Sequence, residues 1–382
     1  MSNTLTNLIP DLYNAADTIS RELTGFIPSV YLNSTADQAA VNQSIVYPVV
    51  GANTAGDIAA AATGPDPADR VTGNSSMSIT KARSVTFYRT GEETMGLGSL
   101  GKTLLQLEFE QAMRTLVNEV EADLAALHLG ASRAYAAHAT TPAALFASNL
   151  GEVAQVRKIL ADNGAPTSDM QLVMNTTAGA ALRTLANLSS TNAAGIPGMI
   201  NQGVLIDIHG MKLRESAQVK SVSTVGTNTG PYVANGAHAA GATTITLKTG
   251  TGTILAGDII TFGTNTADKY VVVTGCAAAG DIVIAAPGLR SAISDGAAVA
   301  VVGACARNMA FDRNAIHLLT RVPAMPEGGD AADDVMNLTD PQSGITFQVA
   351  MYRQRRRIAY EVGLAWGVKA VKTAHIGLLL GQ

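Results

Sequence analysis

The sequence predicts a protein of the α+β class, built from a long helix, a mixed region of helices and strands, and a separate all-β segment. Residues 103–133 carry apolar side chains at the spacing of a helix that buries one face. Residues 149–222 alternate between helical and strand patterns, whereas residues 223–305 lose helical periodicity and are rich in Gly, Thr, Ala and Val. Helices in some stretches and strands grouped in another are typical of the α+β class.

The composition predicts a chain that buries much of its surface. The 382 residues are enough for two or three domain-sized units, and 47% of them are apolar. Charged residues make up 15%, below the ~25% typical of soluble domains, so a monomer would have few charges on its surface. Copies of the same chain or a membrane could cover that surface.

The membrane alternative fails on length. A spanning helix needs ~20 apolar residues, and the longest candidate, residues 370–380, is interrupted by Lys372, Thr373 and His375. The N-terminus, MSNTLTNLIPDLY, also lacks the basic stretch and apolar core of a signal peptide. We therefore expect no membrane association and no export.

Charge and cysteine content bound the chemistry further. Without export, Cys276 and Cys305 are expected to remain reduced thiols, and a bridge between them is the less favoured alternative. The formal net charge of −4 argues against a general nucleic-acid binder, although it allows an inner surface that faces DNA without gripping it.

Residues 1–45 are predicted to form an N-terminal arm, with a short helix near 11–23, and residues 46–100 to form an extended hairpin. Residues 45–50 and 77–90 have strand patterns, and the ~25 residues between them are small, polar and turn-rich. A two-stranded hairpin is marginal in water. Its stability would have to come from packing on something else.

The helix predicted over 103–133 dominates the region 101–148. At 1.5 Å per residue it would be ~45 Å long, longer than is usual in a globular domain. Its apolar positions follow three- and four-residue steps: Leu105, Phe109, Ala112, Leu116, Val120, Leu124 and Leu127.

The region 149–222 is predicted to be an α/β unit. Asn149 is a suitable N-cap and Gly164 a suitable helix stop. The expected elements are a helix over 149–162, a strand over 170–174, a helix over 176–186 and strands over 204–208 and 211–214.

The region 223–305 is predicted to be a small β sandwich or barrel. It is interpreted as an insertion because a mixed helix and strand pattern resumes at Arg307. Its β-type runs are 243–247, 258–262, 270–273, 281–284 and 298–302.

The sequence offers no pattern typical of an enzyme, a cofactor site or a metal site. The six histidines never have metal-ligand spacing, and G-x-S-x-G and zinc-protease motifs are absent. The run at Gly250 shares only its glycines with a phosphate loop. The acidic run 327–334 lacks the alternating ligands of a calcium loop, so we interpret it as a solvated surface loop.

The strongest charge feature is the arginine cluster at 353–357, between the apolar stretches 347–351 and 358–362 of a strand-like run. Arginines could bind nucleic-acid phosphates. Inter-subunit ion pairs are favoured because Arg forms bidentate carboxylate pairs well. The full set of candidate inter-subunit contacts is Lys81, Arg83, Arg89, Glu92, Glu93, Arg353, Arg355, Arg356 and Arg357.

Two C-terminal segments carry a family resemblance. They are NMAFDRNAIHLLTRVPAMP from Asn308 and LAWGVKAVKTAHIGLLLG from Leu364, with QLVMNTTAGAALRTL upstream. Together with the order of the parts, they resemble tailed-phage major capsid proteins with the Hong Kong 97-type fold, of the kind bearing an inserted β domain. The resemblance covers nearly the whole chain.

The resemblance assigns a role to each region. It implies an N-terminal arm over 1–45, an extended loop over a neighbouring subunit at 46–100, a peripheral domain with its spine helix at 101–148, the first part of an axial domain at 149–222, an inserted β domain at 223–305, and the axial and peripheral return with the C-terminal strands at 306–382. It implies pentamers and hexamers in an icosahedral shell around phage dsDNA, without sequence specificity on the inner face.

The same resemblance implies the partners. We expect other copies of the chain, a portal, and a separate scaffolding protein, because no long scaffold segment precedes the arm. A decoration protein is left open. The expected location is the virion, after assembly in the cytoplasm of the bacterial host. A β-rich tail or adhesin-type virion protein, suggested by residues 223–305, is the alternative, and a hydrolase has only scattered carboxylates in its favour.

Overall fold

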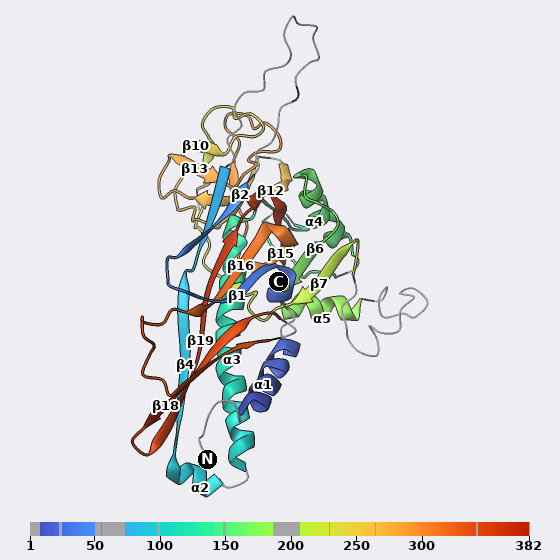
Figure 1. Cartoon of the computed structure of the whole chain (residues 1–382). Helices are drawn as coiled ribbons and strands as arrows, with labels where there is room; N and C mark the ends of the chain where they lie inside the picture. Colours follow the sequence, from blue (N-terminus) through green and yellow to red (C-terminus); the bar gives the residue numbers. More distant parts are fainter. Residues whose placement is uncertain are drawn as a thin grey trace, which may run out of the picture.

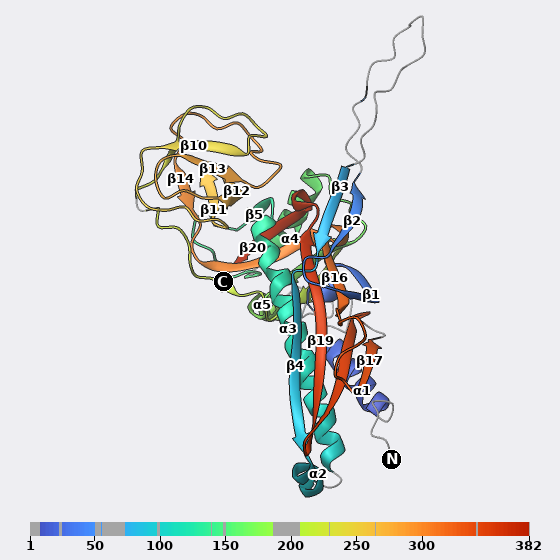
Figure 2. The same cartoon turned by 60° about the vertical axis from the view of Figure 1, so that its left-hand side comes forward.

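The chain is elongated, with a long helix along its axis, a β-rich module beside one end of that helix and a hairpin pointing away from the body (Figures 1 and 2). The computed structural model describes residues 8–22, 25–49, 55, 73–97, 100–138, 140–147, 150–185, 207–228, 230–263, 265–340 and 343–381. The architecture is mixed α and β, as the sequence predicts.

The axial helix is α3 (Leu100–Ala126), which continues as a 3-10 turn over Leu127–Gly130. The predicted long helix is therefore confirmed, although it starts and ends a few residues earlier than expected. The predicted apolar stripe is buried from Leu105 to Leu124 and also includes Met113 and Val117. Helix α1 (Ile9–Glu22) packs against α3.

A six-stranded sheet lies against α3. Strand β19 is its centre: β4 pairs with one edge of β19, and β18 and β16 pair with successive parts of the other edge. The aromatic rings of Phe87, Phe109 and Tyr360 meet between β4, α3 and β19, with centroids 5.0–5.5 Å apart. The strands are β1 (Tyr31–Ala39), β4 (Lys81–Thr90), β16 (Ile316–Pro323), β17 (Asp334–Thr339), β18 (Thr346–Gln354) and β19 (Arg357–Ala370).

A second sheet forms the α/β unit, in the order β7-β6-β15-β20-β5, with β8 pairing with β15. The buried faces of α4 and α5 share an apolar cluster with β6 and β7. Asn175 caps α5, because its side chain accepts a hydrogen bond from the Ala178 N–H at 2.9 Å. The elements are β5 (Arg133–Tyr135), α4 (Gly151–Asp162), β6 (Met170–Met174), α5 (Thr176–Thr184), β7 (Met211–Glu215), β8 (Ser221–Val222), β15 (Cys305–Asp312) and β20 (Ile376–Gly381).

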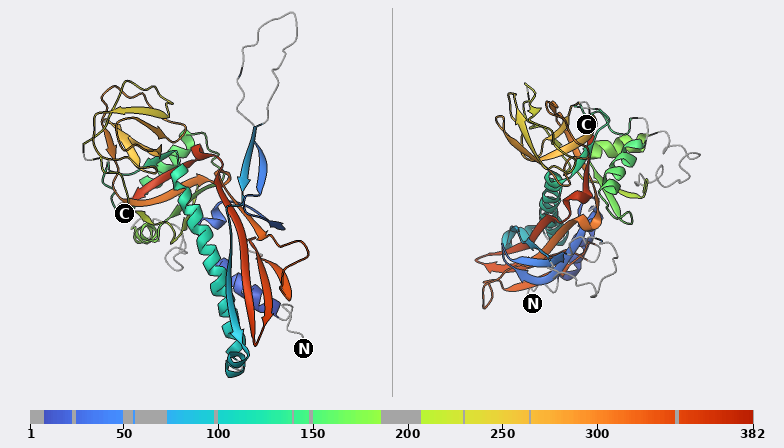
Figure 3. Two further views of the ribbon diagram at one scale, coloured as in Figure 1. Left: turned by 90° about the vertical axis from the view of Figure 1, so that its left-hand side faces the viewer. Right: turned by 90° about the horizontal axis from the view of Figure 1, so that it is seen from above.

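The β-rich module between β8 and β15 has its own apolar core. It is not a separate sheet, because β12 pairs with β5 of the α/β unit through Lys269↔Ala134 and Tyr270↔Arg133. The ladder of the second sheet therefore runs on into the module, which lies beside the α/β unit (Figure 3). The strands of the module are β9 (Val233–Ala234), β10 (Thr244–Lys248), β11 (Ile259–Phe262), β12 (Asn265–Thr274), β13 (Asp281–Ile284) and β14 (Val299–Val301).

The projecting hairpin consists of β2 (Ser44–Val49) and β3 (Gly73–Ser78) and forms a sheet of its own. The expectation of one strand over 77–90 was wrong, because the chain divides there into β3 and β4. The buried Ile79 and the hydrogen bond from the Thr80 N–H to the Trp366 carbonyl separate the two strands.

The remaining elements are α2 (Gly91–Leu97) and 3-10 turns over Ile27–Ser29, Arg313–Ala315 and Thr373–His375. Helix α5 ends at Thr184, two residues before the expected end. The expected cap at Asn149 and most of the expected strand over 204–208 lie outside the described residues.

One buried carboxylate joins the N-terminal segment to α3. Glu121 accepts hydrogen bonds from the N–H groups of Phe26 and Ile27 at 3.1 and 2.8 Å and from the Ser216 hydroxyl at 2.8 Å. A Cβ atom at Gly25 would lie 2.5 Å from a carboxylate oxygen of Glu121, so this position has no room for a side chain and favours glycine. Glu121 thus fixes two distant chain segments to the axial helix.

Glu121→Gln is expected to lower the free energy of unfolding by about 1–3 kcal/mol, because an amide nitrogen would replace one acceptor oxygen and leave buried donors unmatched. Urea unfolding followed by the fluorescence of Trp366, the single tryptophan, measures the change. Glu119→Gln on the same helix is the matched control: its side chain is 42% exposed, so it should cost less than about 1 kcal/mol. Equal losses in the two variants would contradict the role of Glu121.

Candidate subunit-contact surfaces

The arginine cluster lies at a hairpin tip. Strands β18 and β19 are joined by a turn at Arg355 and Arg356, flanked by the Gln354↔Arg357 pair. Arg356 has φ +61°, a left-handed conformation that is uncommon for a residue other than glycine and occurs mainly in turns. The expectation of one strand-like run through 353–357 was therefore wrong. The turn exposes the arginines at one end of the molecule instead of alternating them between two faces.

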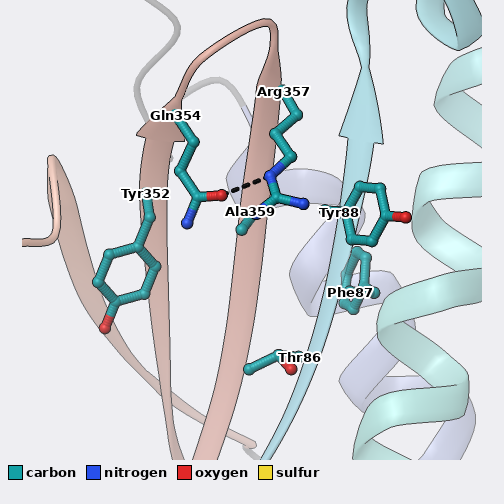
Figure 4. Close-up of a pocket in the computed structure, with 7 residues that line it drawn as sticks. All are labelled: Thr86, Phe87, Tyr88, Tyr352, Gln354, Arg357 and Ala359. Carbon is teal, nitrogen blue, oxygen red and sulfur yellow. Dashed lines mark hydrogen bonds between the residues drawn. The ribbon is translucent and has the colours of Figure 1, made fainter.

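Beside this tip, β4, β18 and β19 form a recess of about 340 Å³ lined by Thr86, Phe87, Tyr88, Tyr352, Gln354, Arg357 and Ala359 (Figure 4). The Arg357 guanidinium lies 4.9 Å from the centre of the Tyr88 ring, and its Nε donates a hydrogen bond to Gln354 at 2.5 Å. Such a cation–π pair holds the Arg357 guanidinium in place, so this surface carries a fixed positive charge.

Tyr352 closes the far side of the recess. Its hydroxyl lies 2.5 Å from a carboxylate oxygen of Asp330 and 3.0 Å from one of Glu361, and these two acceptors share its single proton. Burial, followed by these two carboxylate contacts, raises the pKa of Tyr352 well above its ordinary value. The phenol therefore stays protonated at physiological pH, which suits a fixed contact group and not a general base.

The basic residues of β4 are paired along α3. Lys81 contacts Asp123 at 2.7 Å, Arg83 contacts Glu119 at 3.9 Å, and Arg89 contacts Glu108 at 3.0 Å. Because β4 and the helix run in opposite directions, these pairs follow one another along the whole interface. The structure thus brings three candidate inter-subunit residues together with acids of their own chain.

These three pairs differ in exposure. The Arg83 side chain is 61% exposed, whereas that of Arg89 is 9% exposed and also donates to the Gly101 carbonyl at 2.9 Å. Lys81 lies 6.0 Å from the centre of the Trp366 ring, and the Trp366 indole N–H donates to Asp123 at 2.8 Å. Arg89 and Lys81 therefore fix β4 to α3, while Arg83 remains available at the surface.

Glu92 and Glu93 open helix α2. Glu93 and Thr90 form a reciprocal capping box, with the Thr90 N–H donating to Glu93 at 2.8 Å and the Glu93 N–H donating to the Thr90 hydroxyl at 3.2 Å. The Thr90 hydrogen bonds lower the pKa of Glu93. The Gly91 N–H donates to the Arg356 carbonyl at 3.1 Å, which brings α2 next to the arginine tip.

One end of the molecule therefore combines a basic turn, an acidic helix start and an exposed apolar side chain, Met95, which is 86% exposed. Sequence reasoning identified the charges but missed Tyr88, Tyr352 and Met95. Alternation along 81–90 could have indicated that Tyr88 points outward, whereas the contact of Tyr352 on β18 with Asp330 in the loop before β17 has no sequence signal.

Within the described ranges, no group of three His, Cys, Asp or Glu side chains is placed to hold a metal ion. In the acidic run 327–334, Asp330 accepts from Tyr352 and Asp333 accepts from the Arg353 N–H, so these carboxylates brace the β17–β18 edge. Among the described helices, none combines the length and apolar character needed to cross a membrane.

Neither a protein-family model nor a curated protein matches the chain. Among the solved structures that resemble it are chains of phage structures and of a GTA particle. A chain of the Mycobacterium phage Che8 structure is 13% identical, with a TM-score of 0.48, over 93% of this chain and 90% of that one. The capsid of cyanophage P-SCSP1u is 10% identical, with a TM-score of 0.49, over 94% of this chain and 88% of that one. The capsid of a native GTA particle is 9% identical, with a TM-score of 0.45, over 94% of this chain and 89% of that one.

Arg89→Met is expected to lower the free energy of unfolding by about 1–3 kcal/mol, because it removes a largely buried charged partner of Glu108 and of the Gly101 carbonyl. Arg83→Met, on the same strand, should cost less than about 1 kcal/mol because that pair is exposed. Chemical unfolding of both variants measures the difference. A cost at Arg83 as large as that at Arg89 would contradict the assignment of Arg89 as the anchor of β4.

Proposed function

We propose that the chain is the major capsid protein of a tailed phage, with the Hong Kong 97-type fold and an inserted β domain. The observation that carries the proposal is the β2–β3 hairpin. It pairs only with itself in the described structure, projects from the body and leaves Val46 55% exposed (Figure 3). Since a two-stranded hairpin is marginal alone, a neighbouring copy is the natural cover for it.

The proposed division of the chain follows the sequence-based one: arm at 1–45, extended loop at 46–100, peripheral domain at 101–148, axial domain at 149–222 and 306–382, and inserted domain at 223–305. A hairpin at one end and a charged tip at the other support contacts of the head-to-tail kind. Such contacts close into rings when the rotation between copies allows it. Rings of five and six would build an icosahedral shell around dsDNA, and the many weak contacts would add up.

The proposed partners are other copies of the chain, a separate scaffolding protein, a portal and packaged dsDNA that is contacted without sequence specificity; a decoration protein is a further candidate. The proposed location is the virion, after assembly in the host cytoplasm. Among the candidate contact residues, those that are exposed and suit contacts between copies include Arg83, Glu92, Arg353, Arg355 and Arg356.

A β-rich tail or adhesin protein is the second candidate, and the compact core of the β module favours it. Against it, the largest apolar cluster of the described chain lies around α3 and not in the module. A protein organised on the module would tolerate deletion of residues 103–133, whereas the capsid proposal expects the body to unfold.

Replacing residues 46–76 with Gly-Gly is expected to leave a folded monomer and to abolish closed shells. Ile45 and Met77 are register partners, so a two-residue turn can join them, and the base residues Met77 and Ile79 stay buried. Electron microscopy and sedimentation of the purified chain, with its scaffold where needed, measure assembly. Normal shells from this variant would rule out the neighbour-covering hairpin, and a strictly monomeric wild-type chain would rule out the proposed function.

Arg355→Glu is expected to leave the unfolding free energy within about 0.5 kcal/mol of wild type, because the side chain is exposed. It should reduce shell yield at least about tenfold if the tip meets acidic groups of another copy. Lys220→Glu, an exposed lysine of the α/β unit, makes the same charge change as a control. Raising the salt concentration should weaken wild-type assembly and narrow the difference. Equal yields from the two variants would argue against the tip as a contact.

A further inference from the structure

The hairpin needs a fixed direction if it is to reach a neighbour. Its base is well anchored: Met77 and Ile79 are buried with Ala39, Leu319 and Ala365. The backbone closes the base with hydrogen bonds from Asn42 to Ile79 and from Ile79 to Gln43, at 2.9 and 3.0 Å. An anchored base fixes where the hairpin starts, but it does not fix the angle at which the two strands leave the body.

Strand β19 passes directly against the hairpin at Gly367. A Cβ atom there would lie 2.0 Å from the Ser78 carbonyl oxygen and 3.3 Å from the Ile79 Cα. Any side chain would push the two backbones apart, so glycine is needed for this crossing. It is the point at which the backbones of β3 and β19 come closest.

Besides this backbone crossing and the buried Met77, a polar contact lies two residues further along each strand. The Lys369 ammonium donates to the Ser76 carbonyl at 2.5 Å and to the Ser75 hydroxyl at 3.2 Å. Lys369 lies on β19 opposite His317 of β16, within the six-stranded sheet. The contacts at Met77 and Gly367 lie at the base of the hairpin, whereas the Lys369 contact lies further out along β3 and so constrains the angle at which the hairpin leaves the body.

We propose that Lys369 is a positioning residue that holds the β2–β3 hairpin at the angle needed to engage a neighbouring copy. This inference rests on the proposed shell function. The contact can hold the hairpin angle and still allow that angle to change. It is a charge-assisted hydrogen bond to a carbonyl, it lies at a partly exposed site, and it can break without disturbing the apolar base. The shorter of the two hydrogen bonds goes to the backbone carbonyl of Ser76, and the Ser75 hydroxyl is the second acceptor.

The test compares Lys369→Met, which keeps the stem and removes the donors, with Lys369→Arg, which restores donors. Lys372→Met, an exposed lysine just beyond the end of β19, is the matched control for loss of charge. Hydrogen–deuterium exchange over residues 73–78 in the monomer reports on the hairpin. Shell yield and particle size by electron microscopy report on assembly, and the thermal midpoint with Trp366 fluorescence reports on the body.

Lys369→Met should exchange roughly three- to tenfold faster over 73–78, since the local opening of these strands costs less free energy, and should form few or misshapen shells at an unchanged thermal midpoint. Lys369→Arg should restore both properties, and Lys372→Met should match wild type. Wild-type exchange and normal shells from Lys369→Met would overturn the inference and leave the proposed function intact. If wild type itself forms no shells, the proposed function fails, and the exchange data alone decide the role of Lys369.

A second variant covers the case in which Lys369→Met lowers the stability of the body. Ser75→Asp adds a carboxylate opposite Lys369 at the partly exposed end of the contact. It should slow exchange over 73–78, and combining it with Lys369→Met should cancel the gain. Equal exchange in Ser75→Asp and wild type would overturn the inference.

Discussion

The structure depends on the burial of one helix. The apolar stripe of α3 belongs to a single cluster that also contains α1, the six-stranded sheet and inward-facing residues of the second sheet such as Met309, Ile376 and Leu378. Fully burying each Leu, Val or Phe of this stripe contributes about 1.5–3 kcal/mol. Because the same helix serves both sheets, neither sheet has an independent core on that side, and the two behave as parts of one body.

Charges at the margins of the helix then set geometry more than stability. Asp123 accepts from both Lys81 and Trp366, so one carboxylate fixes where β4 and β19 cross α3. Glu121, two residues earlier, fixes the N-terminal segment on another side of the same turn. Apolar burial supplies the free energy, while these directional contacts choose one arrangement among many of similar burial.

Strong periodicity made the core predictable. The stripe from Leu105 to Leu124, the strand at 170–174 and most strands of the module follow from local patterns in the sequence. The division of 77–90 into two strands was not predictable, because both halves have strand-forming sequences, and the burial of Ile79 and the hydrogen bond to the Trp366 carbonyl that separate them depend on residues far along the chain. The arginine turn was missed because the sequence there, Gln-Arg-Arg-Arg, contains no Gly, Asn or Pro. The candidate contact residues could be identified in the sequence by their charge. Only the fold could distinguish the buried Arg89 from the exposed Arg83.

The pairing of β12 with β5 has a mechanical consequence. A domain joined only by its two chain crossings would swing on those linkers and absorb a push from outside. Here, the ladder from β20 through β5 to β12 is continuous. A load applied to the module passes as shear across strand hydrogen bonds, which yield together and not one at a time. The module would therefore act as a stiff buttress of the α/β unit, and a pull on its outer rim would be felt at the C-terminal strand.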